Sequence, residues 1–243
     1  ALQGHPDARA HLEGDPVLIL AQSSDTPLVQ WSWITDRWDV VLAKLLEHVQ
    51  LTVIAVVVGL IISFPLALWA YRHKKVYPPI TVFTGLLYTI PSLALFALLI
   101  PFTGLSVTTA EIGLVSYTLL ILIRNIVAGL DGVPEDTKEA ALGMGFTRRQ
   151  LLWRVELPLA LPVILAGVRV ATVTTIGLVT VAAFIGKGGF GYFILLGFDR
   201  LFPTALLLGS VLSMAFAIGV DGLLVWTERL VTPWSRSREV VTT

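Results

Sequence analysis

Apolar residues gather along this chain in five long runs that are separated by shorter polar stretches. A helix rises about 1.5 Å per residue, so roughly 20 residues span the hydrocarbon core of a bilayer, which is about 30 Å thick. The runs therefore predict an all-α, polytopic membrane protein. Its five transmembrane helices are expected at approximately 49–70, 80–100, 112–130, 159–185 and 203–227.

The segments outside these runs predict a simple domain order. Residues 1–35 are polar and mixed, as expected for a tail. Residues 36–48 combine one apolar face with charged positions and follow two tryptophans, which predicts an amphipathic helix lying on the membrane surface. Residues 49–230 then form the transmembrane domain, and residues 231–243 form a C-terminal tail.

The distribution of lysine and arginine predicts the orientation in the membrane. These residues cluster in the connections that follow the first, third and fifth runs, whereas the opposite connections hold only Lys187 and Arg200. Positively charged loops stay on the cytoplasmic side. The N-terminus is therefore expected outside and the C-terminus in the cytoplasm.

The overall composition agrees with a bilayer environment and excludes several kinds of function. The chain is 55% hydrophobic and 14% charged, with a mean hydropathy of +0.81. Its formal net charge is zero, so it lacks the basic excess typical of nucleic-acid binding. It contains no cysteine, which excludes disulfides and thiolate metal sites, and its four histidines show no metal-ligand spacing.

The longest predicted cytoplasmic connection, residues 131–158, has the signals of two short helices. Pro134 suits a first helical position, and Gly145 can end the first helix. Thr147 and Gln150 match a capping box that opens the second helix. We expect a helical hairpin at the membrane surface.

This connection carries a recognisable spacing. It reads Glu139-Ala140-Ala141, three residues, Gly145, nine residues, then Val155-Glu156-Leu157-Pro158. The pattern resembles the EAA loop of ABC-importer permeases, with valine in place of the usual isoleucine at Val155. In that family the loop docks on a separate ATPase subunit. The resemblance therefore assigns ATPase coupling to Glu139, Ala140, Ala141, Gly145, Leu157 and Pro158. Met144 and Phe146 are added to the coupling residues because they offer apolar anchors to a groove on a partner.

The resemblance extends over about residues 42 to 230 and is closest to permeases of importers for glycine betaine, carnitine or choline. Strings such as Thr89–Leu95, Tyr117–Leu120 and Ile185–Gly191 carry it. It implies a multi-pass protein of a prokaryotic cytoplasmic membrane, working with a second permease chain and an extracytoplasmic substrate-binding protein. ATP and Mg²⁺ would be bound by the ATPase subunits, and this chain would hold no cofactor and perform no catalysis.

Two alternative functions are weighed against this interpretation. A permease for another small solute, such as a methionine-like amino acid, would share the same loop. An integral-membrane lipid-modifying enzyme would need clustered carboxylates or histidines, whereas the acidic residues of 131–158 are spread along the loop. Gly186, Gly188 and Gly191 match a dinucleotide-binding spacing, but they lie between two membrane runs and outside any βαβ unit.

Ionisable and small polar residues inside the runs are the remaining candidates. Arg124, Arg169 and Asp221 are expected to pair within the bundle, because isolated charges in a membrane are costly, with a translocation-path or gating role as the alternative. Which arginine pairs with Asp221 stays open. Candidates for the translocation path are Thr89, Pro91, Ser92, Thr172 and Thr175, with hydrogen bonding between helices as the alternative role.

Overall fold

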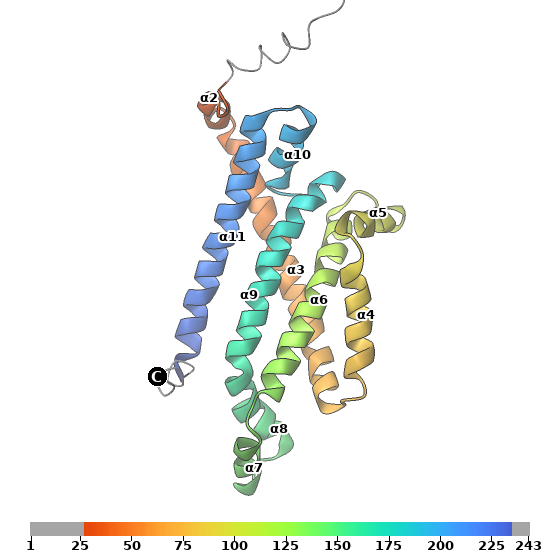
Figure 1. Ribbon diagram of the computed structural model, residues 1–243, viewed down its shortest axis with the longest axis vertical. Coiled ribbons are helices and arrows are strands. Elements are labelled where there is room, and N and C mark those ends of the chain that lie inside the picture. The colour runs from red at the N-terminus through yellow and green to blue at the C-terminus, as the bar shows by residue number, and fades with distance from the viewer. Residues whose placement is uncertain (1–26, 235–243) are drawn as a thin grey trace, which may run out of the picture.

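The computed structural model describes residues 27–234, and every regular element within that range is helical (Figure 1). The predicted all-α class is therefore confirmed. Most of the predicted N-terminal tail and of the C-terminal tail lies outside the described residues. The elements are α2 (Trp31–Thr35), α3 (Trp38–Arg72), α4 (Tyr77–Thr89), α5 (Ser92–Thr103), α6 (Val107–Asp131), α7 (Glu135–Gly143), α8 (Arg148–Leu151), a π-helical turn (Leu152–Glu156), α9 (Leu157–Val181), a 3-10 turn (Ala182–Ile185), α10 (Gly191–Asp199) and α11 (Pro203–Val231).

The predicted membrane runs correspond to long helices. Four helical stretches are long and apolar enough to cross a membrane, and α4 with α5 makes a fifth if this bent pair counts as one span. The four stretches are Trp38–Arg72, Val107–Asp131, Arg148–Ile185 and Pro203–Val231.

The predicted separate helix at 36–48 is wrong in one respect, because α3 continues from Trp38 through the whole first span. No proline or glycine occurs between Trp38 and Val58, and helix formation is cooperative, so nothing ends the helix near His48. The apolar side expected to face lipid also packs on protein. Val41 is buried with Phe190 and Phe193.

The second predicted span is broken at Pro91. Helices α4 and α5 meet at an angle of 94°. Pro91 has no N–H to donate, and it pushes Ile90 out of the helical region to φ −66° and ψ 127°. The freed carbonyl of Ile90 accepts a hydrogen bond from the hydroxyl of Tyr117 in α6.

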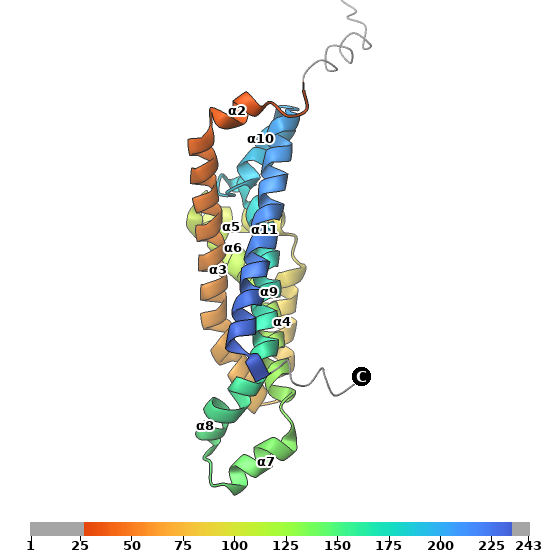
Figure 2. The same cartoon turned by 90° about the vertical axis from the view of Figure 1, so that its left-hand side faces the viewer.

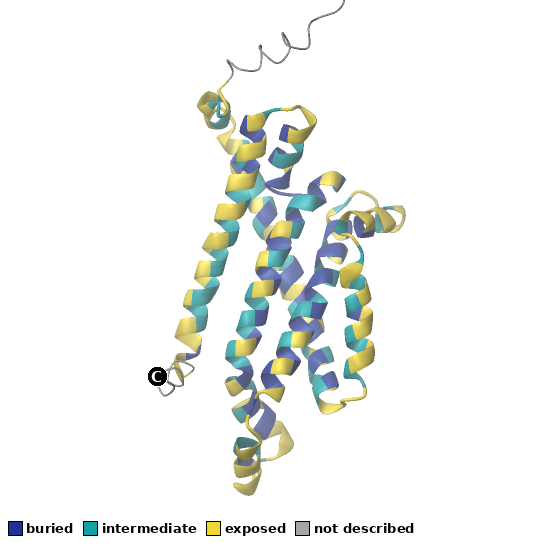
Figure 3. Ribbon diagram, in the orientation of Figure 1, coloured by how far each residue is buried: buried dark blue, intermediate teal, exposed yellow. Residues whose placement is uncertain are grey.

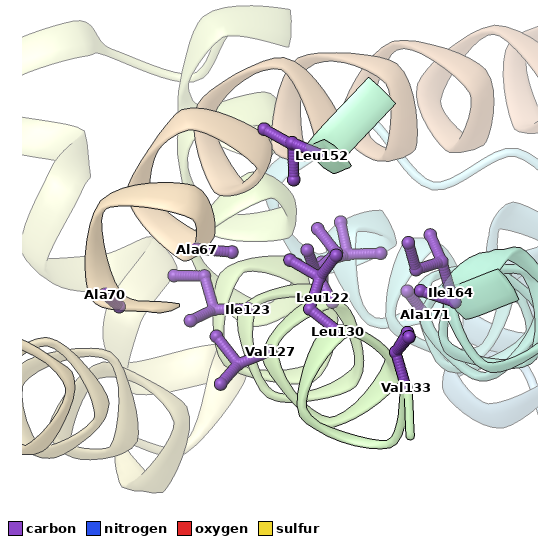
Figure 4. Close-up of a cluster of buried hydrophobic side chains, with 12 residues drawn as sticks. Ala67, Ala70, Leu122, Ile123, Val127, Leu130, Val133, Leu152, Ile164 and Ala171 are labelled. Carbon is purple, nitrogen blue, oxygen red and sulfur yellow. The ribbon is translucent and has the colours of Figure 1, made fainter. Parts of the chain in front are cut away.

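Helix α6 is the centre of the bundle and packs on both α3 and α9. Small and branched side chains fill the space between these three helices near the end that carries α7 and α8 (Figure 4). At Gly167 of α9, an added Cβ would lie 2.3 Å from the Cβ of Asn125 in α6, so only glycine permits this approach. Such close contact between small residues is how helices associate without a hydrophobic driving force.

Helix α11 and the α7–α8 segment stand apart from this core. In the apolar stretch of α11 that could cross a membrane, only 6% of the residues are buried, whereas the share in α6 is 56%. Figure 3 shows that the surface of α11 is mainly exposed or intermediate. Helices α7 and α8 project beyond the bundle at the end opposite α2 and α10 (Figures 1 and 2).

Candidate functional site

The projecting hairpin is shaped by a tight turn at Gly145. This residue has φ +86°, a region in which glycine is favoured. The N–H of Phe146 donates to the carbonyl of Ala141 at 3.1 Å, and the N–H of Gly145 donates to that of Leu142 at 2.9 Å. This pair of bonds is the Schellman arrangement that ends a helix. Gly145 therefore turns the chain from α7 toward α8.

The predicted capping box is present. The N–H of Gln150 donates to Thr147 Oγ1 at 3.3 Å, and the N–H of Thr147 donates to Gln150 Oε1 at 2.8 Å. The second hairpin helix does not stop before Pro158, however, but continues through the π-helical turn into α9. Because Pro158 has no N–H for the carbonyl of Arg154, a wider turn there accommodates the proline without a break.

The proposed coupling residues differ in their exposure. Glu139 and Ala140 are exposed, and Met144 is 71% exposed at the tip of the hairpin. Ala141 is only 2% exposed, so its small side chain serves packing inside the hairpin. Phe146 is half-buried.

The last two coupling residues lie away from the tip. Leu157 and Pro158 are partly buried in the first turn of α9, so they belong to the membrane end of the hairpin. Among the predicted coupling residues, Glu139, Ala140, Met144 and Gly145 are therefore the ones exposed at the tip.

A hydrogen bond that was not predicted from the sequence joins the hairpin to α3. The hydroxyl of Tyr71 donates to Oε1 of Glu156 at 2.8 Å, and Glu156 is buried. The ammonium groups of Lys74 and Lys138 lie 5.0 and 5.9 Å from the centre of the Tyr71 ring. Lys74 also pairs with Asp131 at the end of α6. The only signal in the sequence is an acidic residue, Glu156, within an apolar stretch.

The structure answers which arginine pairs with Asp221. Arg169 Nε lies 3.0 Å from Asp221 Oδ1, and its Nη2 lies 3.2 Å from Oδ2. Nη1 of the same guanidinium lies 3.2 Å from Glu228 Oε2. The three side chains therefore tie α9 to α11. Arg124 is exposed and takes no part in this cluster, and it forms no ion pair within residues 27–234.

The candidate path residues fall into two groups. Thr172 and Thr175 are buried, and their hydroxyls donate to the carbonyls of Val168 and Ala171 in their own helix, each at 2.7 Å. They are thus not accessible to a solute in this conformation.

The other three path candidates gather at the break between α4 and α5. Thr89 and Pro91 are exposed, and Ser92 is half-buried. The irregular backbone at this break is the kind that transporters use beside a substrate path. These three residues remain candidates.

Comparison with known proteins agrees with the arrangement of these elements. Residues 55–233 match the model of the family described as binding-protein-dependent transport system inner membrane component. The chain is 38% identical over 187 residues to the glycine betaine/carnitine/choline transport system permease protein OpuCB of Bacillus subtilis, which covers 77% of this chain and 86% of that protein. It is also 38% identical over 192 residues to the osmoprotectant import permease protein OsmW of Salmonella typhimurium, covering 77% of this chain and 89% of that protein.

The same fold occurs among solved structures. A chain of the inward-facing MetNI methionine ABC transporter superposes with a TM-score of 0.74, at 21% identity, covering 81% of this chain and 98% of that one. A chain of an amino acid ABC transporter superposes with a TM-score of 0.66 at 18% identity, covering 83% and 98%.

Proposed function

Since the chain belongs to the family of binding-protein-dependent transport system inner membrane components, we propose that it is the permease subunit of an ATP-driven importer for an osmoprotectant. Glycine betaine, carnitine and choline are the proposed solutes. The observation that carries this proposal is the similarity, over about four fifths of the chain, to permeases whose names state these solutes. The chain transports and does not catalyse, and hydrolysis of ATP takes place on a separate chain.

The proposed assembly places two permease chains on two ATPase subunits, with ATP and Mg²⁺ bound by those subunits, and an extracytoplasmic binding protein delivering the solute. The second permease is either another copy or a similar chain. The assembly sits in the cytoplasmic membrane of a prokaryote, with the N-terminus outside and the C-terminus in the cytoplasm. Support for this orientation comes from Lys138, Arg148, Arg149 and Arg154 in the hairpin connection, because lysine and arginine are enriched in cytoplasmic loops.

In the proposed mechanism, the exposed tip of the hairpin is the contact with the ATPase. Closure of the ATPase pair on ATP moves the two hairpins, and the permeases exchange inward-open and outward-open states. Helical residues Arg148–Ile185 run without interruption from the hairpin across the bundle, so a displacement of α8 is carried directly into α9. The Tyr71–Glu156 hydrogen bond carries the same displacement into α3.

The alternative solute class is an amino acid such as methionine. The structural similarity to the methionine transporter concerns the fold alone, because the identity is 21%. The curated relatives at 33–38% identity favour quaternary ammonium solutes instead.

Transport in proteoliposomes tests the proposed solute. The purified permease, its ATPase and its binding protein are reconstituted, and uptake of labelled glycine betaine, carnitine and choline is compared with uptake of methionine. We expect ATP-dependent uptake of at least one quaternary ammonium compound and none with an ATPase that cannot hydrolyse ATP. Uptake of methionine with no uptake of the three ammonium compounds would reject the proposal.

A further inference from the structure

An apolar groove runs between α3 and α9 in the half of the bundle nearest the hairpin. Its volume is about 720 Å³, within the range of pockets that bind small molecules. Its walls include Leu60, Ile61 and Phe64 from α3 and Leu161 and Leu165 from α9, and every lining residue is apolar or aromatic. Both helices belong to candidate membrane spans. The groove is therefore suited to a hydrocarbon chain.

Basic residues lie directly beyond the hairpin end of this groove. A second cavity, of about 530 Å³, shares Pro65 and Trp153 with the groove and is lined by Arg72, His73 and Arg149. This juxtaposition places two guanidinium groups at the mouth of the apolar groove.

Two smaller cavities extend the basic surface to either side. One, of about 460 Å³, shares Arg149 with the second cavity and adds Arg154. The other, of about 400 Å³, shares His73 with it and adds Lys74 and Lys75. Among the described residues, no aspartate or glutamate lines any of the three. Within residues 27–234, Arg72, Arg149 and Arg154 form no ion pair, so they are available to an anion.

Tryptophans mark the boundary between the apolar and the basic surface. Trp153 lines the groove and two basic cavities, and its ring centre lies 6.3 Å from that of Phe64 in the groove. Trp69 lines the two basic cavities that meet at His73, one of which it shares with Trp153. Tryptophan side chains favour the level of the lipid headgroups. The groove thus lies in hydrocarbon and the basic cavities lie at the headgroups.

We propose that the groove and the basic cavities together bind one anionic phospholipid. An acyl chain occupies the α3–α9 groove, and the phosphate lies between Arg72 and Arg149, whose planar guanidinium groups match phosphate oxygens. A second copy of this chain fits less well, because a two-fold contact through this face would set the same unpaired arginines against each other. The inference rests on the proposed function only in requiring a membrane protein, and it is independent of the solute.

Native mass spectrometry of the intact complex measures this binding directly. The complex is purified in detergent and exposed to phosphatidylglycerol or phosphatidylcholine with identical acyl chains. We expect the wild-type complex to retain phosphatidylglycerol preferentially. Each basic residue near an anionic headgroup contributes roughly fivefold to binding, so Arg72→Gln with Arg149→Gln should weaken retention about 25-fold. The matched control combines Arg148→Gln with Arg229→Gln, which removes the same charge outside these cavities and should retain phosphatidylglycerol as the wild type does.

A second pair of variants tests the groove itself. Ile61→Trp narrows the groove from an exposed position, and Val82→Trp adds the same bulk on an exposed position of α4 outside it. Retention of phosphatidylglycerol should fall with Ile61→Trp and not with Val82→Trp. The proposal is wrong if wild-type complex retains both lipids equally. It is also wrong if Ile61→Trp releases a permease or an ATPase subunit while lipid retention is unchanged, because the groove would then be a protein contact. Neither result depends on transport, so failure here and failure of the proposed solute are distinguishable.

Discussion

At the scale of single residues, Gly145 acts through its backbone alone. Its φ of +86° is strained for other residues, yet no heavy atom beyond the adjoining residues lies within 4 Å of the position of an added Cβ. Any loss of stability on substitution of Gly145 would therefore arise from backbone strain in the turn and not from a steric clash. The neighbouring Gly143 has equally open space and no positive φ, so it offers a matched comparison within the same hairpin.

Gly145→Val is expected to disrupt coupling and to leave membrane insertion intact. A β-branched residue in the left-handed region costs about 1–3 kcal/mol, which is enough to displace the hairpin, whereas the hydrophobic spans are unchanged. Co-purification with the ATPase and solute-stimulated ATP hydrolysis should both fall. Gly143→Val should behave as the wild type, and equal effects of the two substitutions would show that the turn is not responsible.

The Arg169 cluster makes a different prediction, about stability. Arg169→Gln removes the partner of both Asp221 and Glu228. Because all three side chains are partly exposed, we expect a loss in the free energy of unfolding of about 1–2 kcal/mol, between the values typical of surface and of buried pairs. Denaturant titration in detergent measures it.

Arg124→Gln is the control for this loss, because it removes an exposed arginine of another span that forms no ion pair in the described chain. It should change the unfolding free energy by less than about 0.5 kcal/mol. If Asp221→Asn, introduced into the wild-type protein, leaves the free energy of unfolding unchanged, the bidentate pair does not stabilise the bundle.

At the scale of elements, three connections join the hairpin to the bundle, in addition to the contact of Lys138 with the Tyr71 ring. Two are covalent, through α6 and α9, and the third is the hydrogen bond from Tyr71 of α3 to Glu156 of the π-helical turn. Since α3 packs along α6, we expect any movement of the hairpin to reach all three central helices. A rigid connection of this kind transmits movement from the hairpin to the bundle better than a flexible loop would.

Loss of the Tyr71 hydroxyl is expected to uncouple ATP hydrolysis from transport. Tyr71→Phe leaves a buried carboxylate without its donor, at a cost of about 1–3 kcal/mol, whereas Glu156→Gln keeps a neutral acceptor and should cost less. The measured quantity is solute transported per ATP hydrolysed, which should fall severalfold in Tyr71→Phe while the complex still assembles.

Tyr77→Phe provides the comparison, because the Tyr77 ring packs on the same core and its hydroxyl makes no hydrogen bond within the described residues. Its transport per ATP should equal that of the wild type. If Tyr71→Phe also leaves this ratio unchanged, the link from the hairpin to α3 does not transmit the movement.

At the scale of the whole molecule, burial is uneven. Helix α6 is enclosed, while α11 contacts the rest mainly through α10 and through the Arg169 cluster on α9. Exposed apolar side chains carry little penalty in hydrocarbon, so this arrangement is compatible with a bilayer. The loosely packed α11 and the projecting hairpin are the parts of the chain with most surface left for partners.

The features that the sequence alone determined are local ones. Spans follow from hydrophobic length, and the capping box needs only Thr147 and Gln150, which lie within one turn. The hairpin spacing from Glu139 to Pro158 is likewise contained in one continuous segment.

The tertiary structure decided what depends on which helices pack together. Asp221 pairs with Arg169 and not with Arg124, because α9 and not α6 faces α11. Tyr71 meets Glu156 across 85 positions of sequence. Ala141 faces inward although its spacing indicated a docking contact. Val41, in the first turn of α3, packs on Phe190 and Phe193 instead of facing lipid. Each of these outcomes depends on a contact between segments that are far apart in the sequence. Hydrophobic periodicity and capping signals describe single segments, so they do not predict which segments come into contact.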